Sequence, residues 1–162
     1  MKKVGIVMGS DSDLPIIQRA TDTLRALQIP FEVHVYSAHR TPIPAAEFAR
    51  KARQNGIGVI IAAAGMAAHL AGALAANTTL PIIGIPCKSN TLSGIDALLS
   101  TVQMPPGIPV ATVAVDGGVN AALLSAQILA VTDEELAEKL DAKRQADAEK
   151  VLEKDRGIEE RL

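Results

Sequence analysis

The chain has 162 residues, of which 48% are hydrophobic and only 2% aromatic, and its formal net charge at pH 7 is −2. This composition predicts one globular domain, and the scarcity of aromatic rings together with the acidic balance argues against a nucleic-acid-binding surface. The apolar runs are too short to span a membrane, and the N-terminus leads into a strand rather than a signal peptide. The single cysteine, Cys87, allows neither an internal disulfide nor a cysteine-based metal cluster. We therefore expect a cytoplasmic protein.

Apolar runs alternate with helical patterns along most of the chain. The strands are expected at residues 4–8, 31–36, 59–63, 81–85 and 110–115. The helices are expected at residues 14–27, 43–55, 66–76, 94–102 and 120–131. The third strand is apolar throughout and should be buried on both faces. This alternation predicts an α/β fold with a doubly wound parallel sheet and right-handed crossovers.

Two helix starts carry recognisable capping residues. Thr41 precedes Pro42, and its hydroxyl should cap the second helix. Thr132 and Glu135 form a capping box for a last helix at about residues 133–154.

That last helix has only a thin apolar stripe among many charges, formed by Leu136, Leu140, Val151 and Leu152. Such a helix either packs on a neighbouring subunit or lies in solvent, held by Glu–Lys pairs. We favour packing on a neighbour, because the small-residue segment at residues 67–76 also allows a close approach between backbones. Residues 1–132 then form the α/β catalytic domain, and residues 133–162 are its C-terminal helical extension.

Residues 37–42, Ser-Ala-His-Arg-Thr-Pro, connect the second strand to the second helix. They present a hydroxyl, an imidazole and a guanidinium at the carboxyl end of a strand, where open α/β sheets bind their ligands. An imidazole beside a fixed cation suggests acid–base chemistry on an anionic substrate. For these residues alone, an ordinary polar surface turn remains the alternative. Within this turn, His39 is the candidate for proton transfer.

A strand order of 2-1-3-4-5 would bring three loops to one crevice, those at residues 10–13, 37–41 and 64–69. Ser10 and Ser12 precede a helix and favour a phosphate, and Arg40 can bind the same anion. Asp13 could accept hydrogen bonds from a ribose diol, or it could serve only as the helix N-cap.

In the third of these loops, Ala64 and Gly65 offer backbone N–H groups to a small carboxylate or to carbon dioxide. His69 is expected in the first turn of its helix, where the helix dipole disfavours imidazolium, so we interpret it as a structural hydrogen-bonding residue. His34 lies within a strand and is also interpreted as structural. The sequence has no common nucleotide-binding motif or nucleophile elbow. It also has no convincing metal-ligand spacing, so we expect no metal.

Several stretches, taken together and in order, resemble a known family. They are residues 5–13, 37–42, 65–70, 103–110, 120–124 and 126–129. The chain resembles the bacterial-type catalytic subunits of phosphoribosylaminoimidazole carboxylase, which act as N5-carboxyaminoimidazole ribonucleotide mutases in purine biosynthesis. The resemblance covers about residues 4–132. It implies a flavodoxin-like three-layer fold, a homo-octamer, and an isomerase that needs no metal or organic cofactor.

The resemblance also implies a site. Its nucleotide-binding residues would be Ser10, Ser12, Asp13, Ser37, His39 and Arg40. The loop from Ala64 to Leu70, which includes Gly65 and His69, would hold carbon dioxide while it moves from N5 to C4 of the substrate, and His39 would transfer the protons. Ala63, Met66 and Ala71 replace residues that are frequent in the family.

Two other functions compete with the mutase. A direct carboxylase would add carbon dioxide to aminoimidazole ribonucleotide, but that related enzyme typically has Lys after its catalytic His, whereas this chain has Arg40. A non-catalytic flavodoxin-like binding module would share the fold without needing a proton-transfer residue.

Overall fold

The structure, a computed structural model, describes residues 1–159. Its strands are β1 (Lys3–Met8), β2 (Phe31–Val35), β3 (Ile57–Gly65), β4 (Ile82–Cys87) and β5 (Ala111–Thr112). A 3-10 helix, η1 (Asp11–Asp13), precedes the α-helices. These are α1 (Leu14–Ala26), α2 (Pro42–Lys51), α3 (Leu70–Ala75), α4 (Ile95–Val102), α5 (Gly118–Ala130) and α6 (Glu134–Arg156).

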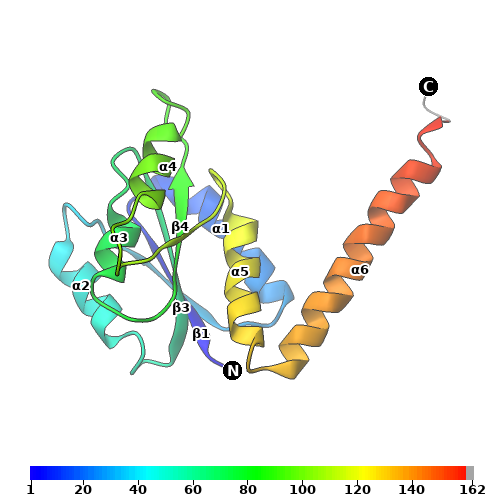
Figure 1. Cartoon of the computed structure of the whole chain (residues 1–162), viewed down its shortest axis with the longest axis horizontal. Coiled ribbons are helices and arrows are strands. Elements are labelled where there is room, and N and C mark those ends of the chain that lie inside the picture. The colour runs from blue at the N-terminus through cyan, green and yellow to red at the C-terminus, as the bar shows by residue number, and fades with distance from the viewer. Residues whose placement is uncertain (160–162) are drawn as a thin grey trace.

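The five strands form one parallel sheet in the order β2-β1-β3-β4-β5, which confirms the predicted α/β architecture (Figure 1). Helices α1 and α5 cover one face, while α2, α3 and α4 cover the other, so the molecule has three layers. In β3, residues 59–63 are at most 1% exposed, as expected for a strand buried on both faces. The apolar character of this strand therefore reflects its central place in the sheet.

Three elements are markedly shorter than the sequence-based expectation. Helix α2 ends at Lys51 rather than at residue 55, and a series of turns completes the connection to β3. Helix α3 begins at Leu70 rather than at residue 66, because Met66 has a φ of 55° and left-handed backbone cannot continue a right-handed helix. Edge strand β5 has two paired residues instead of six.

Both predicted caps are wrong in detail. The Thr41 hydroxyl does not cap α2; it accepts a hydrogen bond from the Ser37 N–H at 2.8 Å and donates one to the Ser37 carbonyl at 3.2 Å. Helix α6 is capped by the carboxylate of Asp133, which accepts from the Leu136 N–H at 3.1 Å, so Thr132 has no capping role. Asp and Thr are both good N-cap residues, and here the cap is one residue later than predicted.

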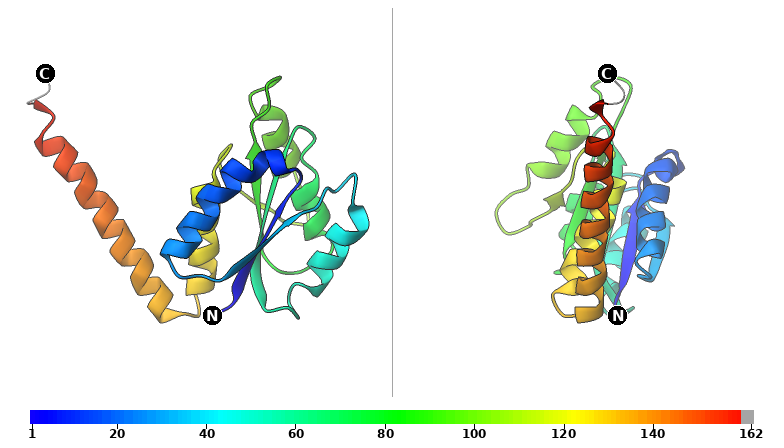
Figure 2. Two further views of the ribbon diagram at one scale, coloured as in Figure 1. Left: turned by 180° about the vertical axis from the view of Figure 1, so that it is seen from behind. Right: turned by 90° about the vertical axis from the view of Figure 1, so that its right-hand side faces the viewer.

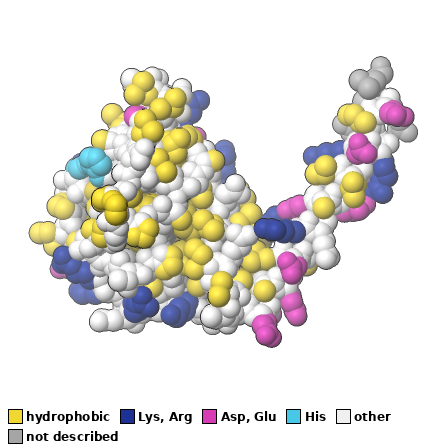
Figure 3. Space-filling view, in the orientation of Figure 1, with side chains coloured by type: hydrophobic (Ala, Val, Ile, Leu, Met, Phe, Trp, Pro, Cys, Tyr) yellow, Lys and Arg dark blue, Asp and Glu magenta, His cyan; other side chains and the backbone are white. Residues whose placement is uncertain are grey.

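Helix α6 leaves the body of the molecule as an arm (Figures 1 and 2). Its start is anchored by Leu136, which is fully buried, whereas Val151 and Leu152 are 63% and 54% exposed. Charged side chains dominate the arm, with apolar groups between them (Figure 3). Its packing on neighbouring subunits and the domain boundary at residue 132 stay predictions, and residues 160–162 of the predicted extension lie outside the described part. No helix within residues 1–159 is long and apolar enough to cross a membrane.

Candidate functional site

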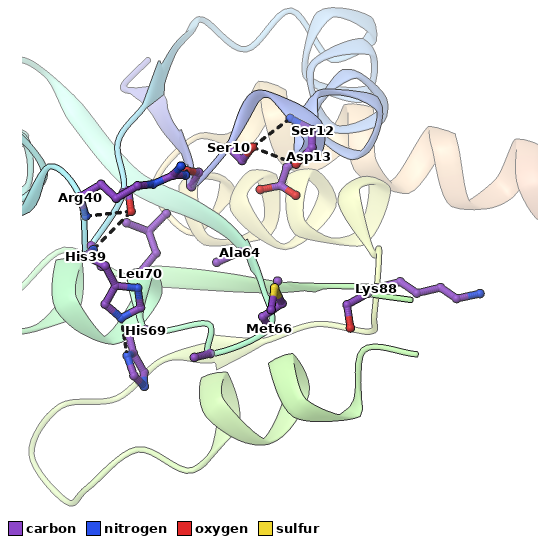
Figure 4. Close-up of a pocket in the computed structure, with 16 residues that line it drawn as sticks. Ser10, Ser12, Asp13, His39, Arg40, Ala64, Met66, His69, Leu70 and Lys88 are labelled. Atoms are coloured by element: carbon purple, nitrogen blue, oxygen red, sulfur yellow. Dashed lines mark hydrogen bonds between the residues drawn. The ribbon is translucent and has the colours of Figure 1, made fainter. Parts of the chain in front are cut away.

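A cavity of about 580 Å³ opens at the carboxyl ends of β1 to β4 (Figure 4). It lies where the strand order reverses between β1 and β3, the usual ligand position in such sheets. All ten residues predicted from the sequence line it, namely Ser10, Ser12, Asp13, Ser37, His39, Arg40, Ala64, Gly65, His69 and Leu70. The structure thus brings the three predicted loops together, and the roles of the individual residues stay predictions.

One corner of the cavity combines two hydroxyls with a guanidinium. Ser10 Oγ accepts hydrogen bonds from the Ser12 N–H at 3.3 Å and from the Ser12 hydroxyl at 2.9 Å. Arg40 Nη2 donates to the Gly9 carbonyl at 3.2 Å, which places the guanidinium beside the same loop (Figure 4). Hydroxyl donors next to a guanidinium form a site suited to a phosphate group. We refer to Ser10, Ser12 and Arg40 as the phosphate corner.

Ser37 shapes the turn that presents the imidazole and the guanidinium. Its Oγ accepts hydrogen bonds from the His39 N–H at 3.3 Å and from the Arg40 N–H at 3.1 Å. The Thr41 hydroxyl bonds both backbone groups of Ser37, as described above. These bonds hold the backbone of the turn independently of the His39 and Arg40 side chains.

Asp13 lies at the start of α1, but its carboxylate makes no capping hydrogen bond and faces the cavity (Figure 4). Burial raises the pKa of the Asp13 carboxyl, and the charges of Asp116 and Asp11 act in the same direction. Hydrogen bonds with the Ser10 backbone and the Cys87 thiol oppose this shift. A half-buried carboxylate with free acceptor capacity can bind the hydroxyls of a sugar.

His39 and His69 form a direct contact that the sequence analysis missed. His39 Nε2 and His69 Nδ1 are 2.8 Å apart, and the two rings are nearly perpendicular, at 78°. His69 was expected in the first turn of its helix, but it is the N-cap residue of a helix that begins at Leu70. One of the two facing nitrogens must carry the proton of this hydrogen bond, so a proton can pass between the rings. Both imidazoles line the cavity.

The loop after β3 forms the apolar wall of the cavity. Ala64 and Gly65 are the last residues of β3, and Leu70, which also lines the cavity, is only 2% exposed. A Cβ atom on Gly65 would lie 3.4 Å from the Cys87 carbonyl oxygen, so a larger residue has little room there. Of the three departures from the family pattern, Met66 lines the cavity, whereas Ala63 and Ala71 are buried in the core.

A fourth loop, between β4 and α4, also lines the cavity through Lys88 and Ser89. No site residue was predicted in this loop from the sequence. The polar segment that directly follows the fourth strand could have indicated a contribution to the site. The carboxyl ends of all strands in a parallel sheet lie at one edge, so the loop after this strand lies beside the other three. The backbone N–H of Lys88 donates to Asp116 Oδ1 at 2.8 Å, while the Lys88 side chain extends away from the other labelled residues (Figure 4).

The remaining histidine lies apart from this arrangement. His34 stacks on Tyr36 with ring centroids 5.2 Å apart and does not line the cavity, which agrees with a structural role. Among residues 1–159, no three His, Cys, Asp or Glu side chains converge as metal ligands would.

Comparison with known proteins gives one consistent family. The family described as AIR carboxylase matches residues 3–150. N5-carboxyaminoimidazole ribonucleotide mutase of Pyrococcus abyssi is 57% identical over 145 residues, covering 90% of this chain and 83% of that protein. The mutase of Bacillus subtilis is 55% identical over 152 residues, covering 93% of this chain and 94% of that protein. The mutase of Escherichia coli is 52% identical over 153 residues, covering 93% of this chain and 90% of that protein.

The crystal structure of Treponema denticola PurE has the same fold, with a TM-score of 0.88 and 28% sequence identity. The match covers 96% of this chain and 97% of that one. The family match extends over the fold and over every loop of the cavity. The chain therefore belongs to the AIR carboxylase family.

Proposed function

We propose that the protein is an N5-carboxyaminoimidazole ribonucleotide mutase. As an isomerase of purine biosynthesis, it converts N5-carboxyaminoimidazole ribonucleotide into 4-carboxy-5-aminoimidazole ribonucleotide. The observation that carries this proposal is the convergence of a phosphate corner, a sugar-facing carboxylate, a histidine pair and a narrow apolar loop on one cavity. A binding module would not need the histidine pair, and the Pyrococcus abyssi, Bacillus subtilis and Escherichia coli relatives named above are mutases rather than direct carboxylases.

The cavity suggests how the nucleotide lies. Its 5′-phosphate binds the phosphate corner, where the Arg40 guanidinium supplies the opposite charge. Asp13 accepts hydrogen bonds from the ribose diol. The aminoimidazole ring then lies against Ala64 and Gly65, within reach of His39.

The reaction moves one carboxylate within this site. The bond between N5 and the carboxyl carbon breaks, His39 gives a proton to N5, and carbon dioxide is released into the cavity. The electron-rich C4 then attacks the carbon of carbon dioxide, and the proton displaced from C4 returns to His39. Atoms and charge balance without a metal or an organic cofactor. Retaining carbon dioxide beside the ring avoids the entropic cost of a second bimolecular encounter.

His69 completes the proton path. Its Nδ1 atom is 2.8 Å from His39 Nε2, so it fixes the orientation of the catalytic ring and can share its proton. The rest of the turn is held by backbone hydrogen bonds to Ser37. The catalytic imidazole is therefore oriented before the substrate binds, which is favourable for proton transfer.

An isotope experiment tests this proposal. Purified protein is given nucleotide with a 13C-labelled N5-carboxylate, without ATP and in an excess of unlabelled bicarbonate. A mutase forms the C4-carboxylated product with the label retained. Unlabelled product would indicate a direct carboxylase that uses dissolved carbon dioxide, and the absence of product would contradict the enzymatic function itself.

The proposal extends to the assembly and the location of the protein. We expect a cytoplasmic homo-octamer in which α6 packs on neighbouring subunits, with a small-molecule substrate and no nucleic-acid or membrane partner. The octamer number comes from the resemblance to the family. The physical support is the exposure of Val151 and Leu152, at 63% and 54%, on an arm that only its first turns anchor.

A further inference from the structure

The loop between β4 and α4 contains a buried hydroxyl without a partner. Within residues 1–159, three side-chain polar atoms are buried and make no hydrogen bond: Ser89 Oγ, Asp96 Oδ1 and Thr112 Oγ1. Of these three residues, only Ser89 lines the cavity. In this rotamer the oxygen itself is closed off from the cavity that the residue lines. A buried hydroxyl is normally hydrogen-bonded, so we expect rotation about χ1 to turn Ser89 Oγ toward a ligand in the adjoining cavity.

The strand register locates Ser89 within the cavity. The last two pairs between β3 and β4 are Ala64 with Pro86 and Gly65 with Cys87. Ser89 follows two residues after Cys87, so it lies beside the loop that continues from Gly65. The phosphate corner belongs to the loops after β1 and β2, on the other side of β3. Ser89 is therefore placed at the carbon dioxide end of the site rather than at the phosphate end.

Asp116 holds the loop in this position. Its Oδ1 atom accepts from the Lys88 N–H at 2.8 Å, and its own N–H donates to the Pro86 carbonyl at 2.9 Å. The φ of Asp116 is 58°, a left-handed conformation that Asp and Asn adopt more readily than most residues. These bonds clamp the residues on either side of Cys87. Ser89 is thus presented by an anchored loop, as a binding residue should be.

We propose that the Ser89 hydroxyl, turned toward the cavity by rotation about χ1, donates a hydrogen bond to the migrating carboxylate of the substrate. The proposal rests on the mutase function and adds a recognition residue to it. The carboxylate needs donors, and the Ala64–Gly65 segment offers only backbone N–H groups. A hydroxyl on the facing loop supplies one more donor, which stabilises the carboxylate at C4 and orients it for the return reaction.

Binding measurements on two nucleotides test this role. Calorimetry compares 4-carboxy-5-aminoimidazole ribonucleotide with aminoimidazole ribonucleotide, which lacks the carboxylate. A His39→Asn background separates binding from turnover. Ser89→Ala should weaken binding of the carboxylated nucleotide by about tenfold or more, as expected for the loss of a hydrogen bond to a charged group. Binding of aminoimidazole ribonucleotide should weaken by less than about twofold. Ser89→Thr, which keeps the hydroxyl, should restore binding.

Ser100→Ala is the matched control, because the Ser100 hydroxyl donates to the Asp96 carbonyl within α4 at 2.7 Å and does not line the cavity. Unchanged affinity of Ser89→Ala for both nucleotides would overturn the proposal. An equal loss for both would also overturn it, by placing Ser89 against the ring or the ribose. These results leave the mutase function intact, whereas failure of the unmodified protein to form carboxylated product would contradict that function.

Discussion

Replacing His39 by asparagine tests the proton transfer on which the proposed reaction depends. Asparagine keeps a hydrogen-bond donor and much of the side-chain shape, but it cannot take up and release a proton. General acid–base catalysis is typically worth about a hundredfold or more in rate. We therefore expect turnover to fall by at least this factor, which corresponds to about 2.7 kcal/mol in the activation free energy.

Substrate binding should change much less in the same variant. The Ser37 hydroxyl bonds the backbone N–H groups of residues 39 and 40 at 3.3 and 3.1 Å, and asparagine leaves both bonds in place. The Arg40 guanidinium also keeps its contact with the Gly9 carbonyl. The affinity for aminoimidazole ribonucleotide should therefore fall by less than about tenfold, the upper value of one neutral hydrogen bond.

The assay combines steady-state turnover of N5-carboxyaminoimidazole ribonucleotide with calorimetric binding of aminoimidazole ribonucleotide. His34→Asn is the control, because His34 stacks on Tyr36 outside the cavity and should keep normal turnover. Turnover of His39→Asn close to that of the unmodified protein would refute the reasoning. His39 would then only position the substrate, and His69, at 2.8 Å, would be the next candidate for proton transfer.

Three further predictions concern binding, assembly and pH. Arg40→Ala should weaken binding of the 5′-phosphorylated nucleotide by about 1.5–3 kcal/mol in calorimetry. Unchanged affinity would show that Arg40 does not bind the phosphate. Light scattering should give an oligomer whose mass falls when the exposed Val151 and Leu152 are both changed to Glu, whereas a monomer mass for the unmodified protein would exclude the assembly. Because the pKa of Asp13 is raised on folding, its contribution to stability falls as pH rises from the unfolded pKa through the higher folded one. Asp13→Asn should therefore raise the Tm relative to the unmodified protein at pH 7 but not at pH 3, while weakening nucleotide binding; an equal Tm difference at both pH values would argue against the shift.

The sheet and the position of the cavity could be predicted because they depend on periodicity and topology alone. A fully apolar strand at residues 59–63 must lie inside the sheet, and it does, as the central part of β3. Once β1 and β3 are neighbours, the loops that follow them meet at the same edge whatever their side chains do. The convergence of ten predicted residues on one cavity follows from this backbone geometry.

Local boundaries were less predictable because neighbouring residues offer nearly equal alternatives. Thr132 and Asp133 are both favourable N-cap residues, and only the structure shows that Asp133 bonds the Leu136 N–H. The alanine-rich pattern before Leu70 is typical of a helix, but the left-handed backbone at Met66 delays the helix by one turn. Where two local conformations differ little in free energy, tertiary contacts rather than local propensity decide between them.

Side-chain pairing is the part of the site that the sequence could not supply. His39 and His69 are separated by thirty residues, and their contact depends on the orientation of two loops. Ser37 and Ser89 also show that residue type alone does not predict which partner a side chain has. The Ser37 oxygen accepts hydrogen bonds from two backbone N–H groups and stabilises its own turn. Ser89 lines the cavity, and its hydroxyl makes no bond among the described residues.

The same contrast divides the site into groups that are already satisfied and groups that still need a partner. Ser37 and Thr41 use their hydroxyls to fix the backbone of the turn, so changing either one should act through the position of His39. Asp13, as a helix N-cap without a capping bond, and Ser89, whose hydroxyl has no partner within residues 1–159, keep polar capacity that a ligand in the cavity can use. Because an unsatisfied polar group is costly in the empty protein, binding a substrate that satisfies it recovers free energy. Selectivity for the carboxylated nucleotide should therefore depend on Ser89 more than on Ser37, although the sequence motif draws attention to Ser37.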